Sequence, residues 1–130
     1  MNRKYLLPSG INFKLCKWSP KDIIWMNILP AAGSVKNGWD KFIQEKEKVT
    51  IVISYPNNIP KTISYKPDPS ELKNLKPLIT TIQEEYEKLY CEAKTDIKKK
   101  WMITGRRYED LVLRDILIDL ETYEIFPVVY

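Results

Sequence analysis

The feature that most constrains the fold is a pair of short segments in the middle of the chain, "KVTIVISY" (48–55) and "KTISY" (61–65). In the first segment β-branched residues alternate with others, so that Val49, Ile51, Ile53 and Tyr55 share one side, as in a half-buried strand. Between the two segments, "PNNIP" consists of turn-forming residues. The pattern predicts an antiparallel β-hairpin, and any fold for the chain must build a sheet around it.

A long amphipathic helix is predicted after this hairpin. "DPSE" marks a helix start, with Asp68 as cap, Pro69 in the first turn and Glu71 completing a capping box. A new start at Pro77 then opens a run of apolar residues at spacings of three and four. This run comprises Leu78, Ile79, Ile82, Tyr86, Leu89, Tyr90, Ala93, Ile97 and Trp101, and Gly105 is expected to cap the helix C-terminus.

The N-terminal third shows weaker signals. "INFKLCKW" (11–18) alternates and predicts a half-buried strand. "SPKD" follows as a helix start, with Ser19 as cap, and the short helix is expected to stop before Pro30. The glycine and asparagine content of "PAAGSVKNG" predicts a loop, and "WDKFIQEKEK" (39–48) predicts a second short helix.

The last twenty residues, "LVLRDILIDLETYEIFPVVY", predict two closing strands joined by a turn at "ETYE". Pro127 suggests an edge or a bulge in the last strand, and Tyr108–Leu113 also fits a helical start. The resulting order is β-α-α-β-β-α-β-β. We therefore expect a single α+β domain over residues 1–130, with a mainly antiparallel sheet, one long helix in the C-terminal half and short N-terminal helices packed on the sheet.

Composition excludes several kinds of catalytic site. The chain has no histidine, and its two cysteines, Cys16 and Cys91, are not in metal-ligand spacing, which excludes zinc sites of cysteine and histidine and any histidine base. With four glycines there is no phosphate-binding loop. No export signal or membrane span is evident. We expect a cytoplasmic, non-enzymatic protein without cofactor or metal.

Two motifs with catalytic associations lie in "PDPSELK" (67–73). The acids and the lysine superficially match a metal-dependent nuclease site, and Ser70 with Lys73 matches a Ser-x-x-Lys pair. Both sets are compressed into a helix start, where Asp68 and Glu71 already serve as capping residues. We interpret the segment as a cap.

The C-terminal segment 106–130 is acidic, with six Asp and Glu against three Arg, although the chain as a whole carries +4. On a strand, Asp115, Asp119 and Glu121 would project to one side, most simply as the wet face of the sheet. If the set is functional, it would serve either as a negative stripe for a basic partner or as a cation site. The candidate partner-binding patch comprises Asp110, Asp115, Asp119, Glu121, Tyr123, Glu124 and Tyr130.

A second candidate surface is basic. "KKKWMITGRR" places three lysines where they complement the dipole at the end of the long helix, which is the simpler interpretation. The alternative is a contact with a polyanion such as nucleic acid. The residues for that contact are Lys98, Lys99, Lys100, Arg106 and Arg107.

In architecture and composition, with a lone α+β domain closed by the hairpin "DILIDLETYEIFPVVY", the chain resembles the small immunity proteins of bacterial contact-dependent growth inhibition and other polymorphic toxin systems. The resemblance implies tight binding to a cognate toxin domain, which would block the active site of the toxin or a surface it needs. The alternative is a small basic nucleic-acid-binding protein of a phage or mobile element.

Overall fold

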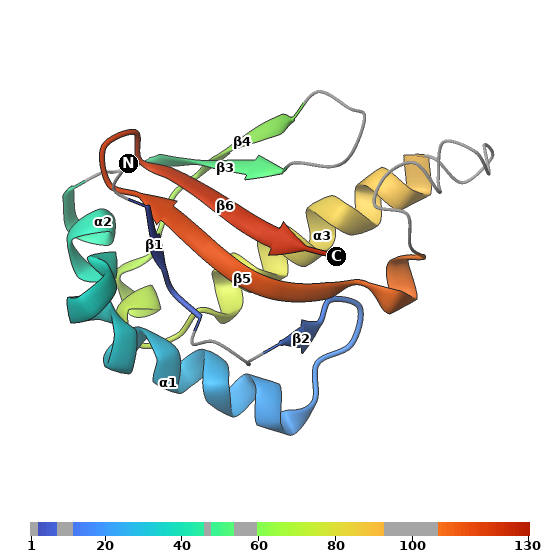
Figure 1. The fold of residues 1–130 in the computed structure, drawn as a ribbon, viewed down its shortest axis with the longest axis horizontal. Helices are drawn as coiled ribbons and strands as arrows, with labels where there is room; N and C mark the ends of the chain where they lie inside the picture. The colour runs from blue at the N-terminus through green and yellow to red at the C-terminus, as the bar shows by residue number, and fades with distance from the viewer. Residues whose placement is uncertain (1–2, 8–11, 46–47, 54–59, 93–106) are drawn as a thin grey trace.

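The fold was analysed in a computed structural model, which describes residues 3–7, 12–45, 48–53, 60–92 and 107–130. Its strands are β1 (Arg3–Tyr5), β2 (Phe13–Lys14), β3 (Val49–Ile53), β4 (Lys61–Tyr65), β5 (Val112–Asp119) and β6 (Glu124–Val129). Its helices are α1 (Pro20–Asn37), α2 (Trp39–Glu45) and α3 (Lys76–Glu92), with two short 3₁₀ helices, η1 (Pro69–Leu72) and η2 (Tyr108–Asp110). The predicted α+β class is therefore confirmed (Figure 1).

The strands form one mixed sheet in the order β1-β5-β6-β3-β4, with β2 also paired to β5. Both predicted hairpins are present: β3 pairs with β4 and β5 with β6, each antiparallel. The two hairpins meet where β6 runs parallel to β3, through Thr50 opposite Glu124 and Ile51 opposite Ile125. The mainly antiparallel sheet that we expected is thus divided by a parallel seam, which hairpin patterns in the sequence do not predict.

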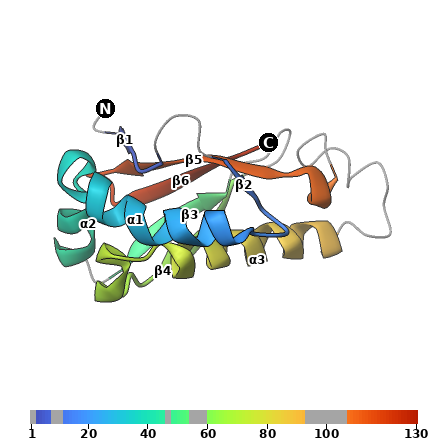
Figure 2. The same cartoon turned by 90° about the horizontal axis from the view of Figure 1, so that it is seen from below.

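Helices α1 and α3 lie on the same side of the sheet (Figure 2). Alternate residues of the strands point toward them and are fully buried, among them Ile51, Ile116, Ile118 and Ile125. The helices contribute Met26, Trp39, Phe42, Leu78, Ile79, Ile82 and Tyr86 to the same core. None of the described helices lies over the opposite face of the sheet.

Helix α1 contradicts the prediction that it stops before Pro30, since it continues to Asn37. A proline inside a helix has no N–H to donate, so the carbonyl four residues earlier loses its partner. In this protein that carbonyl belongs to Met26, and it accepts a hydrogen bond of 3.0 Å from the backbone N–H of Leu75. The tertiary bond replaces the missing helical one, so the predicted loop over residues 30–38 is wrong. The expectation of only short N-terminal helices is wrong too, since α1 spans 18 residues and α3 is described over 17.

The end of α1 is set by Gly38, whose φ of +74° lies in the left-handed region. A Cβ at this position would lie 2.9 Å from Cδ1 of Leu120, so the glycine also permits a close approach. Helix α2 begins at the next residue, as predicted, and its Trp39 side chain donates from Nε1 to the backbone oxygen of Glu71 at 2.9 Å. This bond ties α2 to η1, the 3₁₀ turn that precedes α3.

The remaining expectations are met in part. The strand predicted over 11–18 is reduced to Phe13–Lys14, and β1 was not foreseen. Helix α3 is described over 17 residues, and the predicted extension from Ala93 to Gly105 falls outside the described residues. Around Tyr108 the structure has a 3₁₀ turn, after which β5 begins at Val112. The suggestion that Pro127 marks an edge or a bulge in the last strand is wrong, because β6 lies between β5 and β3 and the bulge is in β5; the pairing of β6 with β3 ends at Ile125, before the proline.

Candidate binding surface

The sheet face that α1 and α3 leave uncovered carries a row of apolar side chains. Successive residues on a strand point to opposite faces, so the neighbours of the buried Ile116, Ile118 and Ile125 are turned away from the core. Tyr5 pairs with Leu117, and Leu117 pairs with Phe126 on the adjacent strand. One residue farther along β3 and β6 than the pair Ile51–Ile125, Val52 comes next to Phe126. We call Tyr5, Leu117, Phe126 and Val52 the apolar row.

Exposure differs along the apolar row. Tyr5, at the end of the row on β1, is 60% exposed, and Leu117 and Phe126 are half-buried. Val52 is only 8% exposed and lies outside the main core cluster, so it adds little accessible surface to the row. Isolated apolar residues at a protein surface are ordinary, whereas a continuous row with a protruding aromatic is typical of a contact surface.

A bulge between Leu113 and Asp115 shapes one end of this face. Because Leu113 and Ile116 both point into the core, Arg114 and Asp115 between them are turned outward. The Arg114 guanidinium lies over the Tyr130 ring, with Cζ 4.4 Å from the ring centroid, and its Nε donates to the Tyr130 backbone oxygen at 3.2 Å. Tyr130, which is 51% exposed, is held in place by this contact.

Five of the seven residues of the predicted acidic patch fall into three groups in the structure. Asp115, Glu124 and Tyr130 lie on or beside the uncovered face, at β5, β6 and the residue after β6. Glu121 lies exposed in the turn between the two strands. Asp110 is in η2, where it forms an ion pair with Arg107 at 3.4 Å.

Asp119 and Tyr123 have structural roles that their sequence positions did not reveal. Asp119 is 7% exposed, and its Oδ1 accepts hydrogen bonds from the backbone N–H groups of Glu121 and Thr122 at 2.9 and 3.2 Å. Tyr123 has a φ of +56°, and its ring packs 5.9 Å from that of Phe42 against the core. These two residues shape the β5–β6 turn, so the stripe of three acids predicted on one strand is not formed as expected.

Burial raises the pKa of Asp115, and its hydrogen bond from the Ile116 N–H, at 2.9 Å, acts in the opposite direction. A carboxylate with a raised pKa is incompletely hydrated, and an approaching cation would compensate for the lost water. Within the described ranges no group of three or more metal-ligating side chains is found. On this face Asp115 and Glu124 lie two residues before Leu117 and Phe126 on their strands, so they flank the apolar row.

The segment "PDPSELK" forms a capping box, as interpreted from the sequence. Oδ1 of Asp68 accepts from the Ser70 N–H at 2.8 Å, and Oε2 of Glu71 accepts from the Asp68 N–H at 2.7 Å. Glu71 is fully buried, and its Oε1 accepts from the Tyr65 hydroxyl at 2.5 Å. Burial raises the pKa of Glu71, while these hydrogen bonds lower it in part. Both acids are engaged locally and do not converge on a metal or nucleophile.

Of the five residues proposed for polyanion binding, only Arg107 lies within the described residues. Lys98, Lys99, Lys100 and Arg106 lie outside the described residues. Arg107 is exposed and forms the ion pair with Asp110. In the part of the chain that the structure describes, no helix is both long enough and apolar enough to cross a membrane.

The apolar row was not predicted, because each strand was expected to have only one buried side. In "DILID" and "EIFPVV" apolar residues occupy both alternating sets of positions. Apolar residues on both faces of a strand could have indicated that the second face also carries an apolar surface. Comparison of the chain with protein-family models, with curated proteins and with solved structures found no match.

Proposed function

We propose that this protein is an immunity protein that neutralises a cognate bacterial toxin domain by binding it through the uncovered face of the sheet. The observation that carries the proposal is the apolar row, with its 60% exposed Tyr5, on a face that none of the described helices covers. A rigid sheet that presents an aromatic anchor beside half-buried apolar side chains is suited to a specific protein contact.

Charge at the margins of the face supports the same proposal. Asp115, Glu124 and Glu121 lie along β5, β6 and their turn, and segment 106–130 carries an excess of acids. Toxins that cleave nucleic acids present basic surfaces to their substrates, so acids around an apolar centre would complement them. In this proposal the protein acts in the cytoplasm and by occupancy, without a reaction of its own.

The first experiment is a tagged pull-down from the native host followed by mass spectrometry, with nuclease-treated and untreated samples in parallel. We expect one stoichiometric protein partner that survives nuclease treatment. Recovery of nucleic acid, with protein partners that disappear after nuclease, would overturn the proposal and favour a nucleic-acid-binding protein.

A pair of variants then tests the surface. Tyr5→Ala removes the exposed anchor of the apolar row, and we expect it to weaken partner binding by about 2 kcal/mol, or roughly 30-fold in Kd. Ile24→Ala is the matched control, because Ile24 is 57% exposed but lies on α1, on the other side of the sheet. Equal loss of affinity in both variants, or loss only in the α1 variant, would exclude the uncovered face as the binding surface.

A further inference from the structure

Among the described residues, strand β4 ends the sheet, and no strand lies beside its outer edge. It is paired with β3 over all five of its residues, from Lys61 opposite Ile53 to Tyr65 opposite Val49. In the described part of the chain no strand pairs with its other side. The N–H and C=O groups along such an edge are a template for another extended segment.

The direction of the backbone groups in β4 follows from a single bond in β3. The Thr50 N–H donates to the Tyr123 oxygen on the β6 side at 3.1 Å. Thr50 and Val52 therefore bond toward β6, and the residues between and beside them bond toward β4. Across the antiparallel pairs, Thr62 and Ser64 are opposite Val52 and Thr50, so their N–H and C=O groups point away from β3 to the outer edge. Both residues are exposed.

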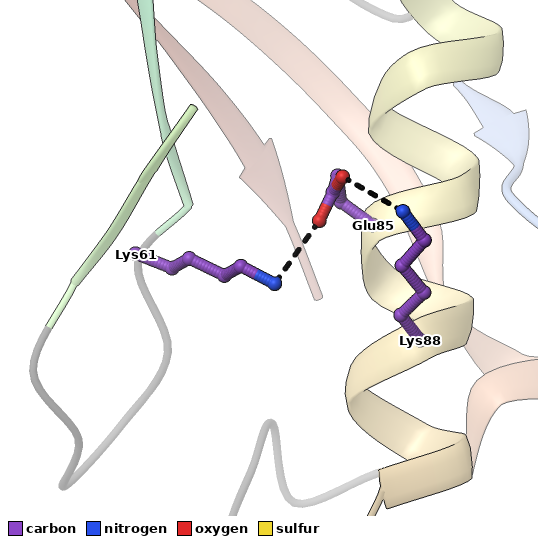
Figure 3. A network of polar contacts seen from close by, with 3 residues as sticks. All are labelled: Lys61, Glu85 and Lys88. Atoms are coloured by element: carbon purple, nitrogen blue, oxygen red, sulfur yellow. Dashed lines mark hydrogen bonds and ion pairs between the residues drawn. The ribbon is translucent and has the colours of Figure 1, made fainter. Parts of the chain in front are cut away.

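The side chains of β4 that face the helices fix the strand from beneath. Ile63 packs against the core, and the Tyr65 hydroxyl donates to the buried Glu71. Lys61 extends toward α3, where its Nζ lies 3.2 Å from Oε2 of Glu85 (Figure 3). An incoming strand would therefore meet an edge that is already ordered, which lowers the entropy cost of pairing.

The residues at the two ends of β4 limit the length of edge that can pair and make both ends positively charged. In "PKTISYKP" (60–67) a proline and a lysine stand at each end of the strand, which restricts pairing to the few residues between them. At the Lys61 end, two ammonium groups share one carboxylate, since Nζ of Lys88 lies 3.4 Å from Oε1 of Glu85 (Figure 3). At the other end Lys48 is exposed, as is Lys66, which already has a partner of its own. Positive charge thus flanks both ends of the pairing site.

The geometry points to β4 as a docking edge for a short extended segment of the toxin partner, with acidic residues at its ends. Its backbone would pair with Thr62 and Ser64, its carboxylates would contact the flanking lysines, and an apolar side chain would lie beside Ile63. That the segment belongs to a toxin rests on the proposed function. That it is extended and acidic at its ends follows from β4 and the lysines beside it.

The test uses a fluorescent synthetic peptide with alternating valine and threonine in the middle and two glutamates at each end, measured by anisotropy. A second peptide has lysines in place of the glutamates. We expect the acidic peptide to bind at least about tenfold more tightly than the basic one, with a preference that falls as salt is added. Equal binding of the two peptides would refute the charge assignment.

Ser64→Pro tests the backbone, because it deletes an N–H that points outward and leaves the bonds to β3 in place. We expect it to weaken binding of the acidic peptide at least about tenfold, whereas Ser64→Ala, which keeps the N–H, changes it less than about twofold. Unchanged binding by folded Ser64→Pro protein would overturn the inference.

Two N-methylated forms of the acidic peptide make the test independent of whether Ser64→Pro folds. They carry the methyl groups on alternate amides, so that one form blocks the edge facing β4 and the other blocks the opposite edge. We expect one form to lose binding and the other to retain it, and equal effects would refute strand pairing. If the toxin is captured normally by Ser64→Pro protein but lost with Tyr5→Ala, the docking edge fails and the proposed function stands.

Discussion

Tyr65→Phe isolates one buried hydrogen bond and is expected to destabilise the protein by about 2 kcal/mol at neutral pH. The substitution removes only the hydroxyl that donates to Oε1 of Glu71 at 2.5 Å. Glu71 is fully buried, so water cannot easily replace the lost donor. A hydrogen bond to a charged group contributes about 1.5–3 kcal/mol, from which the expected cost follows.

The cost should depend on pH. The bond from Tyr65 lowers the pKa of Glu71, against the larger effect of burial, because it stabilises the carboxylate. Once Glu71 is protonated in both proteins, the lost bond is a neutral one, worth about 1 kcal/mol. The difference between wild type and Tyr65→Phe should therefore shrink as the pH is lowered through the pKa of Glu71.

The assay is urea denaturation followed by tryptophan fluorescence, together with thermal unfolding. For 130 residues the entropy of unfolding makes 2 kcal/mol equivalent to a fall of about 7 °C in Tm. Tyr5→Phe is the matched control, since its ring is 60% exposed, and it should change stability by less than about 0.5 kcal/mol. A loss below about 0.5 kcal/mol for Tyr65→Phe at pH 7 would refute the reasoning.

Three further perturbations test other parts of the structure. Gly38→Ala combines a φ of +74° with a Cβ 2.9 Å from Leu120, and chemical denaturation should show a loss of about 1–2 kcal/mol, whereas no loss would contradict the left-handed backbone. Asp119→Ala removes the acceptor of two turn amides and should cost about 1–2 kcal/mol in the same assay, while a neutral result would contradict the turn contacts. Burial raises the pKa of Asp115, so the folded state holds this proton more tightly and stability falls as pH rises above about 4. Asp115→Asn should remove that part of the pH dependence, and an unchanged profile would contradict it.

Local patterns in the sequence predicted the elements that are stabilised locally. The hairpin β3–β4, the C-terminal hairpin and the capping box at Asp68 each depend on neighbouring residues, and each was found where it was expected. The run of α1 through Pro30 was not predictable, because the bond that permits it comes from Leu75, far along the chain. The parallel seam between β3 and β6 is likewise a contact between distant segments.

The candidate surface was likewise predictable only where it depends on local sequence, and not where it depends on contacts between distant segments. Asp115, Glu124 and Tyr130 were selected from the sequence and lie on or beside the uncovered face. Tyr5 was missed because β1 consists of only three residues, too few for a periodic pattern, and it joins the face only through its pairing with Leu117. Which of two apolar faces a strand buries depends on where the helices lie, and this is decided by the whole fold.

The position of β6 has a consequence for how the protein is made. This strand is the last in sequence order, yet it lies between β5 and β3 and joins the two hairpins of the sheet. On the ribosome, β3 and β4 are synthesised long before the strand that must pair beside them, and until then their inner edge has no partner within the sheet. Folding of the whole sheet therefore has to wait for Val129 to emerge, and a chain terminated before Glu124 would consist of two half-sheets with nothing between them.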